Sequence, residues 1–399
     1  METLFAQVSS LCDRGQTRRL RMIDGTAHNL YYVAARGLDA TATAEYFASR
    51  ERGRVGQVTE IAIIVPVLNE EQYIRACLAS LIPQAKAAGA EIILVDGGST
   101  DSTRAIVYEE ACSCTLLRLM DNPGRIQSIG VNLGARATSA ALIMRADAHA
   151  TYPGDFIRRC VDAYYAKEAT SVVVPMRTIA QTGFQRAVAA AQNGRIGNGG
   201  AAHRRAGASG FVDHGHHALF ERAFFLSISG YDESFTHNED AEFDYRAVAA
   251  GGRIWLCAEA PVSYYPRRDP AQLARQYFRH GRGRARMLQK HRLWPRPRQV
   301  APLFILGFVS TGCLLAPLAP ICLAAPAAYA MLCVGWGMPD AVRARDPWKL
   351  ATGVAAMIMH LSWAIGFLSV VWQRTGVGTA PKAGCGAGRF SGVTGDQVR

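Results

Sequence analysis

The 399-residue chain contains no CxxC pair, and several of its ten scattered cysteines lie inside apolar runs. This distribution argues against a disulfide framework or a cysteine zinc site and indicates reduced, buried thiols. The N-terminus has no basic segment leading into an apolar core, so we expect no cleavable signal peptide. Acidic residues are in deficit: 44 Lys and Arg face 32 Asp and Glu, for a net charge of +12. The excess predicts an anionic partner such as nucleic acid, anionic lipid or a phosphorylated substrate.

Charged residues are also absent from two long stretches, 303–338 and 350–372. At about 1.5 Å per helical residue, the first is too long for one membrane crossing and suits two, at about 303–319 and 321–338. The second is long enough to cross once. The alternative is a pair of core helices in a soluble domain, which this length without charge disfavours.

Basic residues flank the first apolar stretch on both sides. Residues 267–298 hold ten Arg and one Lys against a single acid, Asp269, and Arg343, Arg345 and Lys349 follow the stretch. If both basic segments are cytoplasmic, as the positive-inside rule favours, residues 303–338 form a hairpin that returns the chain to the same side. We therefore expect a multi-pass membrane protein whose larger N-terminal part is cytoplasmic.

Apolar β-branched runs alternate with helical patterns between residues 61 and 256. The expected strands are 61–67, 91–96, 115–120, 141–145, 171–175 and 253–256, and the expected helices are 70–88, 99–110, 125–140, one after Asp155 and a segment from 238. This alternation predicts a doubly wound α/β sheet. Residues 181–210, rich in Gly, Ala and Arg, are interpreted as a flexible loop over the site.

Polar residues stand where three of these strands end: Asn69, Asp96 and Asp147. Ligands of open α/β sheets bind outside the carboxyl ends of the strands, so these residues are expected to share one crevice. Asp147 and His149 are two residues apart, which places them on the same side of an extended segment, where they could hold one metal ion. The alternative is a surface turn that happens to carry both.

Five motifs in this order resemble those of family 2 glycosyltransferases with the GT-A fold, and of bacterial succinoglycan-type exopolysaccharide glucosyltransferases among them. They are Val65-Pro-Val-Leu-Asn-Glu-Glu, Asp96-Gly-Gly-Ser-Thr-Asp, Arg145-Ala-Asp-Ala-His, Asn238-Glu-Asp and Gln276-Tyr-Phe-Arg-His, within about residues 61–286. Two positions depart from the family pattern. Its D-x-D motif is Asp147-Ala-His149 here, and His280 replaces the Trp of the Q-x-x-R-W signature of processive enzymes.

The resemblance implies how the chain is divided. An N-terminal extension of unassigned role (1–58) precedes a GT-A catalytic domain (59–265) and a basic interfacial segment (266–300). Transmembrane helices (301–372) and a disordered tail (373–399) follow. It also implies location in a bacterial inner membrane, with the catalytic domain in the cytoplasm.

The resemblance further implies a UDP-sugar donor site. Its nucleotide-sugar-binding residues are Pro66, Asn69, Glu70, Asp96, Arg145 and Asp147. Asp96 would accept a hydrogen bond from the uracil ring; the alternative is an acid that stabilises a helix N-terminus. Asp147 and His149 would hold Mn²⁺ or Mg²⁺ on the diphosphate, and the imidazole favours Mn²⁺.

On the acceptor side, the resemblance makes Asp240 the catalytic base, with Glu239 and Asp213 as the next candidates. Residues expected at the diphosphate and acceptor are Gln276, Arg279, Arg282, Asp213, His216, His217 and Glu239. Glu242 and Asp244 are expected to be solvated or salt-bridged. The cluster at 213–217 also permits a zinc site, which the lack of nearby cysteine disfavours.

The implied function is an inverting hexosyltransferase that moves glucose from UDP-glucose onto a polyprenyl-diphosphate-linked sugar in exopolysaccharide biosynthesis. Expected partners are membrane lipids and other components of a polysaccharide assembly complex, with no nucleic acid. One alternative is a processive β-glycan synthase. Another is a catalytically dead, basic, membrane-tethered protein that binds polysaccharide or nucleic acid.

Overall fold

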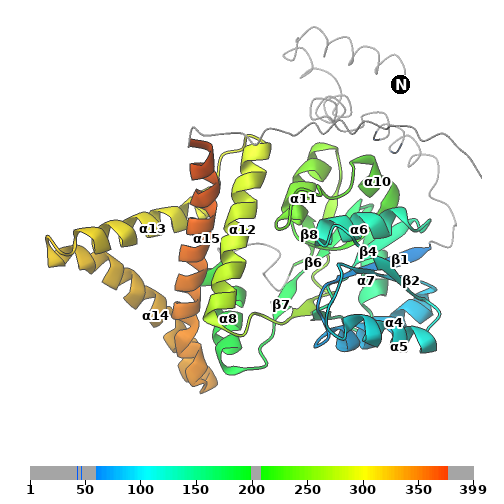
Figure 1. The fold of residues 1–399 in the computed structure, drawn as a ribbon, viewed down its shortest axis with the longest axis horizontal. Helices are drawn as coiled ribbons and strands as arrows, with labels where there is room; N and C mark the ends of the chain where they lie inside the picture. The colour runs from blue at the N-terminus through cyan, green and yellow to red at the C-terminus, as the bar shows by residue number, and fades with distance from the viewer. Residues whose placement is uncertain (1–42, 44–45, 47–59, 199–207, 376–399) are drawn as a thin grey trace, which may run out of the picture.

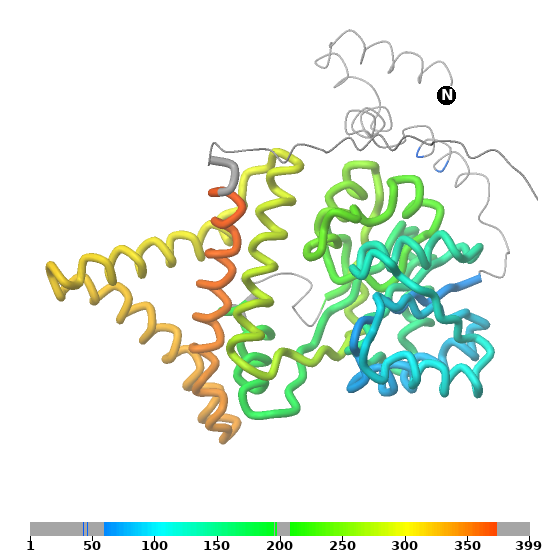
Figure 2. The backbone as a smooth tube through the Cα atoms, in the orientation of Figure 1, coloured from blue at the N-terminus to red at the C-terminus, as the bar shows by residue number. Residues whose placement is uncertain are grey.

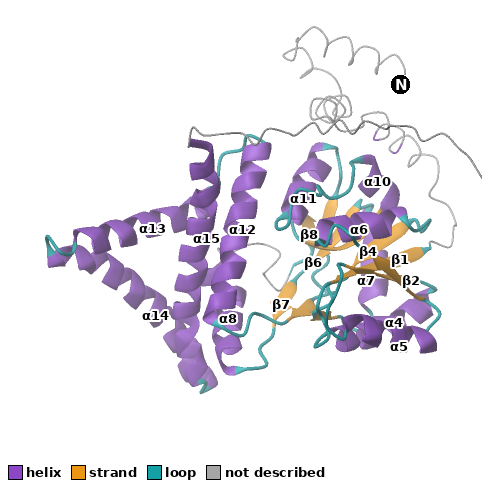
Figure 3. Ribbon diagram, viewed as in Figure 1, coloured by secondary structure: helices purple, strands orange, loops and turns teal. Residues whose placement is uncertain are grey.

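The computed structural model describes residues 43, 46, 60–198 and 208–375 (Figure 1). Apart from residues 43 and 46, the expected N-terminal extension lies outside the described residues, as does the tail beyond residue 375. An α/β domain forms one side of the described chain, and long helices form the other (Figure 3).

The α/β domain is built on an eight-stranded sheet. Across the sheet, the strands are β3 (Leu117–Asp121), β2 (Glu91–Asp96), β1 (Ile61–Val67), β4 (Leu142–Arg145), β9 (His216–Glu221), β6 (Ser171–Val174), β10 (Ile254–Leu256) and β8 (Gly210–Val212). The first four run parallel, whereas β9 is antiparallel to both β4 and β6. The expected α/β alternation is thus confirmed within a mixed sheet. Strand β9 escaped the sequence pattern because its histidines interrupt the apolar run that marks a buried strand.

The register of the parallel strands brings their ends to one edge. Val67 on β1 lies beside Asp96 on β2, and Asp96 lies beside Asp121 on β3. Strand β4 pairs with the other side of β1 and ends at Arg145. A small second sheet lies beyond this edge and consists of β5 (Ala150–Thr151), β11 (Val262–Tyr264) and β7 (Met176–Thr178).

Helices cover both faces of the large sheet because alternate strand residues point to opposite sides. Ile63 on β1 packs in one apolar cluster with α4 (Ile74–Ala88), α5 (Thr103–Ser113) and α7 (Phe156–Lys167). Its neighbour Ile64 packs in a second cluster with α6 (Gln127–Arg136), α10 (Arg222–Ser227) and α11 (Glu239–Ala249). Both strand residues are fully buried, which explains the unbroken apolar run in the sequence.

Two helices begin later than expected, α4 at Ile74 instead of residue 70 and α5 at Thr103 instead of Ser99. The residues that precede the two helices form hydrogen bonds between the loops after β1 and β2, and they do not extend the helices. Asn69 accepts a hydrogen bond through Oδ1 from the Thr100 N–H at 2.8 Å. The hydroxyl of Ser99 donates to Asp96 at 2.6 Å, so Ser99 does not cap α5.

The expected flexible loop at 181–210 is wrong for its first half, which forms α8 (Gly183–Asn193) and α9 (Arg195–Asn198). A capping box of Thr182 and Gln185 begins α8. The small apolar face of α8 is buried against the C-terminal helix α15 (Thr352–Thr375). This long-range contact cannot be recognised in the local composition. Residues 199–207 lie outside the described residues.

The C-terminal part begins with the basic helix α12 (Pro270–Lys290), followed by α13 (Pro297–Leu315), η3 (Pro320–Leu323), α14 (Ala324–Ala344), η4 (Pro347–Ala351) and α15. Figure 2 shows α13 and α14 projecting away from the rest and meeting at a turn. Three segments are long and apolar enough to cross a membrane: Pro297–Leu315, Pro320–Ala344 and Pro347–Trp372. The expected three apolar helices are therefore present, with shifted boundaries.

Helices α12 and α15 lie side by side (Figure 1). Glycines permit their close approach: a Cβ on Gly281 would meet the carbonyl oxygen of Trp363, and one on Gly366 would meet that of Phe278. In contrast, most large apolar side chains of α13 and α14 are exposed. The hairpin thus presents apolar surface, whereas α15 also packs against the rest of the chain.

Candidate active site

A cavity of about 910 Å³ lies between the carboxyl edge of the sheet and the helices α12, α13 and α15. Eight of the expected site residues line it: Arg145, Asp147, His149, His216, Glu239, Asp240, Gln276 and Arg279. Seven others do not: Pro66, Asn69, Glu70, Asp96, Asp213, His217 and Arg282. The strand-end and helix motifs therefore meet, although residues 145 and 276 are far apart in sequence.

Asp147 is buried at the edge of the sheet and surrounded by hydrogen-bond donors. Its Oδ1 accepts from Arg145 Nε at 3.2 Å and from Gln127 Nε2 at 3.0 Å. Burial acts to raise the pKa of Asp147, but Arg145, His216 and His149 outweigh it and hold that pKa well below its usual range. The carboxylate is therefore ionised at neutral pH.

Two histidines flank Asp147. The Nδ1 of His149 lies 3.0 Å from Glu70 Oε1, which leaves Nε2 of the same ring for another partner. His216 Nε2 lies 3.5 Å from Asp147 Oδ2, and burial lowers the pKa of His216 to about 4, so its imidazole is neutral. A neutral imidazole, an ionised carboxylate and a histidine backed by a carboxylate are donors that suit a divalent metal.

This donor chemistry fits a metal, but the side chains are not gathered into a complete ligand set. Among the described residues, no three His, Cys, Asp or Glu side chains are grouped closely enough to hold a metal ion. The same finding leaves the zinc alternative at 213–217 without support in the described chain. Glu70, which is expected in the nucleoside pocket, contacts the expected metal ligand His149.

Asp96 is fully buried and does not line the cavity. Its carboxylate accepts hydrogen bonds from the Ser99 N–H and hydroxyl and from Arg104 Nη1 at 2.7 Å. Burial acts to raise the pKa of Asp96, but these bonds outweigh it and lower that pKa. Arg104 also pairs with Asp121, so it bridges the ends of β2 and β3. The Asp96 carboxylate thus holds the loop that follows its own strand.

Glu239 and Asp240 open helix α11 beside Arg145. Arg145 Nη1 lies 3.5 Å from Glu239 Oε1, and Asp240 Oδ1 accepts from the Ala241 N–H at 2.7 Å. Burial, assisted by Asp240, raises the pKa of Glu239 to about 7 despite Arg145. For Asp240, His214 and Arg145 outweigh burial and lower the pKa. The two neighbouring acids therefore differ in proton affinity, with Asp240 ionised at neutral pH.

A chain of buried polar contacts connects these groups. Arg145 donates to the Tyr231 hydroxyl at 3.2 Å, and that hydroxyl lies 2.6 Å from His217 Nδ1. His217 Nε2 contacts Asp244 at 2.6 Å, and His214 contacts the same carboxylate at 2.7 Å. His217, expected at the acceptor, is buried inside this network. No local motif in the sequence indicated Tyr231.

Gln127 was also missed, although it follows strand β3 at the same sheet edge, where the strand-end rule could have found it. Two expected residues, Asp213 and Arg282, have partners outside the cavity lining. Asp213 pairs with Arg296 at 2.7 Å, and the guanidinium of Arg282 lies over the Phe278 ring. Gln276 lines the cavity and donates to the Tyr264 hydroxyl at 3.0 Å.

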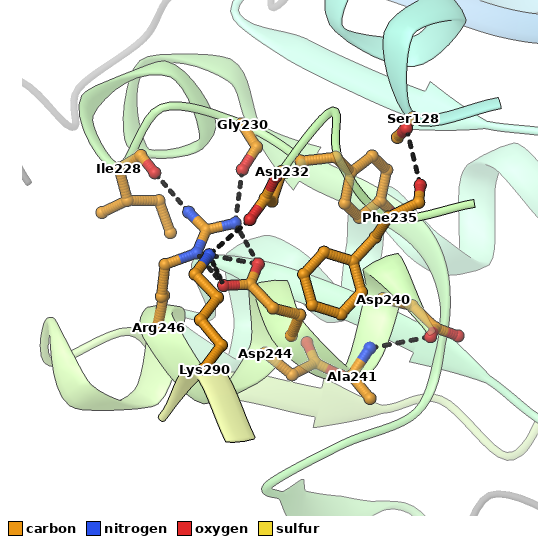
Figure 4. A network of polar contacts seen from close by, with 12 residues as sticks. Ser128, Ile228, Gly230, Asp232, Phe235, Asp240, Ala241, Asp244, Arg246 and Lys290 are labelled. Atoms are coloured by element: carbon orange, nitrogen blue, oxygen red, sulfur yellow. Dashed lines mark hydrogen bonds and ion pairs between the residues drawn. The ribbon is translucent and has the colours of Figure 1, made fainter. Parts of the chain in front are cut away.

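Helix α11 is anchored by the charged network shown in Figure 4. Arg246 donates to the carbonyls of Ile228 and Gly230 and pairs with Glu242 at 2.7 Å. Glu242 also contacts Lys290, at the end of α12, at 2.5 Å. Glu242 and Asp244 are therefore buried and paired, so the expectation of solvated side chains is wrong and that of salt bridges is confirmed.

Comparisons with known proteins agree with this architecture. The family model described as glycosyl transferase family 2 matches residues 62–228. The chain is 42% identical over 311 residues to the succinoglycan biosynthesis protein ExoA of Rhizobium meliloti (strain 1021), covering 77% of this chain and 94% of that protein.

More distant proteins are also similar. A dolichyl N-acetyl-α-D-glucosaminyl phosphate 3-β-D-2,3-diacetamido-2,3-dideoxy-β-D-glucuronosyltransferase of Methanococcus voltae is 22% identical, over 77% of this chain and 95% of that one. The mannosyltransferase PcManGT from Pyrobaculum calidifontis, solved with GDP-Man and Mn²⁺, matches with a TM-score of 0.50 and 18% identity over 88% of this chain and 99% of that one. The fold is thus of the GT-A type, and the chain belongs to glycosyl transferase family 2.

Proposed function

We propose that this glycosyltransferase moves glucose from UDP-glucose onto a polyprenyl-diphosphate-linked sugar in exopolysaccharide biosynthesis, with inversion at the anomeric carbon. The 42% identity to a succinoglycan biosynthesis protein supports the pathway. One structural observation carries the reaction type: a single cavity contains an ionised carboxylate at the sheet edge, a pair of acids on α11 and several arginines of α12. This combination suits a nucleoside diphosphate leaving group beside a hydroxyl nucleophile.

The donor lies at the carboxyl edge of β1, β2 and β4 in this proposal. Pro66, Asn69 and Asp96 bind the nucleoside, and Arg145 with Asp147 orients the sugar diphosphate. Asp96 already accepts hydrogen bonds from Ser99 and Arg104, so binding of the uracil ring uses a carboxylate whose position is already determined. Such preorganisation reduces the entropy lost on binding.

A divalent cation, Mn²⁺ or Mg²⁺, is proposed at Asp147 with His149, and it would act as a Lewis acid that offsets charge on the departing UDP. Glu70 orients the His149 ring and leaves its Nε2 available. The neutral His216 beside Asp147 is a further candidate donor. Arg279 and Gln276 contribute to the diphosphate and acceptor side of the cavity.

Asp240 is the proposed base. It lines the cavity in the ionised form, so it can accept the proton of the attacking hydroxyl as the bond to UDP breaks. Direct displacement by that hydroxyl inverts the anomeric centre, so an α-linked donor yields a β-linked product. Arg145 contacts Glu239 and would keep this acid, the neighbour of Asp240, in place.

The proposed location is a bacterial inner membrane, with the α/β domain in the cytoplasm. Exposed apolar side chains on α13 and α14 support insertion of the hairpin, and the arginines of α12 support contact with anionic lipid headgroups. Other components of a polysaccharide assembly complex are proposed as partners.

Sugar transfer by purified protein tests the function. The chain, in detergent micelles with Mn²⁺, is incubated with lipid-linked saccharides and labelled UDP-glucose, UDP-galactose, UDP-N-acetylglucosamine or GDP-mannose. We expect transfer from UDP-glucose, a β linkage by NMR, and transfer slowed about 10²-fold or more with Asp240→Asn. Preference for another donor would contradict the sugar assignment, and an α linkage would contradict inversion.

A further inference from the structure

The cavity holds more positive charge than a single donor diphosphate accounts for. Its lining contains six arginines, Arg145, Arg267, Arg275, Arg279, Arg284 and Arg298, but only three carboxylates, those of Asp147, Glu239 and Asp240. Arg145 pairs with Asp147 and Glu239. No ion pair joins the other five arginines to a carboxylate of the described residues.

Four of these arginines form two groups, each with one member on α12 and one on a neighbouring segment. The lining residues Gln272, Gln276, His280 and Arg284 recur every four residues and cover about 18 Å of helix axis at 1.5 Å per residue. The first group consists of Arg279 and Arg267, whose positive charges act together with burial to lower the pKa of the nearby His237 to about 4. Arg279 is already assigned to the diphosphate in the proposed function, so this group is taken as the donor side of the cavity.

The second group consists of Arg284 and Arg298. Burial lowers the pKa of Arg284, and the positive charges of Arg298 and Arg296 act in the same direction, opposed by Asp240. Arg296 is paired with Asp213, which leaves Arg284 and Arg298 as two neighbouring cations in the cavity. Two like charges in a partly buried site repel each other, and a bound anion would relieve that repulsion.

The same end of the cavity is apolar on its outer side. Pro302 and Ile305 of α13 and Trp363 of α15 complete the lining there. Helices α13 and α15 pack against each other and are two of the three segments apolar enough to cross a membrane. Figure 1 shows α13 leaving the body of the protein beside α15. A ligand that satisfies this end must therefore combine an anion with a hydrocarbon chain.

We propose that Arg284 and Arg298 bind the diphosphate of a polyprenyl-diphosphate acceptor, whose chain leaves the cavity past Ile305 and Trp363 into the bilayer. This inference rests on the proposed function, because it assigns the acceptor of that reaction to one part of the cavity. Asp240, whose charge acts on Arg284, then lies close to the acceptor diphosphate, where an attached sugar meets the donor. The donor and acceptor phosphates are held by different residues.

Direct binding to the full chain in detergent micelles tests the assignment. The probes are undecaprenyl diphosphate, inorganic pyrophosphate, undecaprenol and UDP. We expect Arg284→Gln and Arg298→Gln each to weaken undecaprenyl diphosphate binding about 10-fold or more, the loss typical of one hydrogen bond between charged groups. UDP affinity should change less than about 2-fold, because UDP occupies the other group.

Two further variants control for charge and folding. Arg286→Gln removes the same charge from the same helix at an exposed position outside the cavity, so undecaprenyl diphosphate binding should stay within about 2-fold. Arg284→Lys keeps a positive charge and should retain more affinity than Arg284→Gln. Ile305→Ser should weaken undecaprenyl diphosphate while leaving pyrophosphate unchanged.

Three results would overturn the inference. Equal loss of UDP binding in Arg284→Gln would assign this residue to the donor. If pyrophosphate binds as tightly as undecaprenyl diphosphate, the lipid chain does not contribute to recognition. If Arg286→Gln weakens undecaprenyl diphosphate binding as much as Arg284→Gln does, the effect comes from general surface charge. The proposed reaction can be contradicted independently of this site. Lipid binding that depends on the two arginines, without any sugar transfer, would contradict the reaction and support the site. Sugar transfer that is insensitive to Arg284 and Arg298 would support the reaction and contradict the site.

Discussion

The side-chain amide of Asn238 donates a hydrogen bond to the backbone carbonyl of His280 at 2.9 Å. This contact joins the residue before the acids of α11 to the middle of the basic helix α12. Asn238 itself has a left-handed backbone, with φ of 64°. The position of Asp240 therefore depends on how closely α12 approaches this turn.

Gly283→Ala should disrupt that approach. A Cβ at Gly283 would lie 2.5 Å from the His237 carbonyl oxygen and 2.9 Å from Asn238 Nδ2. Helix propensity alone favours Ala over Gly by about 1 kcal/mol, so a loss of activity would identify the steric contact. We expect sugar transfer to fall about 10-fold or more, with UDP binding nearly unchanged. Gly335→Ala is the matched control, because nothing lies within 4 Å of its Cβ; equal effects in both variants would contradict this reasoning.

Removal of the metal should stop sugar transfer. The proposed metal ligands Asp147 and His149 do not themselves offset the charge of the diphosphate, which is the role of the bound metal ion. EDTA should therefore abolish activity, and Mn²⁺ or Mg²⁺ should restore it. Asp147→Ala should cost more than His149→Ala, because Asp147 also orders Arg145 and Gln127. Full activity in excess chelator would exclude the metal, and the reverse order of the two variants would show that His149 is the principal ligand.

Asp240→Asn and Asp96→Asn should affect different steps. Asparagine at 240 cannot accept the proton, so kcat should fall by about 10²–10⁴-fold while UDP affinity changes little. Asp96→Asn should weaken UDP binding, because it disturbs the bonds to Ser99 and Arg104 that hold the donor loop. Near-normal turnover of Asp240→Asn would move the base to Glu239, whose pKa is raised to about 7 by burial.

Glu242→Gln tests the buried network between α11 and α12. His291, Arg246 and Lys290 outweigh burial and depress the pKa of Glu242. Its folded pKa lies below its unfolded value, so its stabilisation is present above the unfolded pKa and is lost as pH falls towards the folded pKa. We expect Glu242→Gln to cost about 3 kcal/mol at pH 7. Below about pH 4.3, the thermal stability of the variant should fall less steeply with falling pH than that of the wild type. Parallel plots of melting temperature against pH would contradict a stabilising role of ionised Glu242.

Reporter fusions test the membrane arrangement. If α13 and α14 form a membrane hairpin, as proposed, the chain returns to the cytoplasm and a reporter after Lys349 should read cytoplasmic. If α15 then crosses the membrane, a reporter after Thr375 should read periplasmic. A periplasmic signal at 349 would mean that the first apolar stretch crosses once. A cytoplasmic signal at 375 would mean that α15 lies along α12 at the membrane surface.

Local chemistry in the sequence determined the strands, the strand-end acids and the apolar helices. Continuous β-branched runs such as 61–65 are buried on both faces wherever they pack, so their identity as strands does not depend on the rest of the chain. Asp147 follows such a run, and the parallel topology places it at the sheet edge. Chargeless length likewise identified the apolar segments without any knowledge of their neighbours.

Only the tertiary structure decided which polar groups share the cavity. Strand β9 has no apolar run that marks it, yet it inserts antiparallel beside β4 and brings His216 to Asp147. His216 and His217 are neighbours in the sequence, but alternate strand residues face opposite sides of the sheet. His216 therefore lines the cavity, whereas His217 is buried against Asp244. Helix α8, expected as a loop, is stabilised by α15, which begins more than 150 residues later. Such long-range packing is not encoded in local periodicity, because its energy comes from surfaces that meet only in the folded chain.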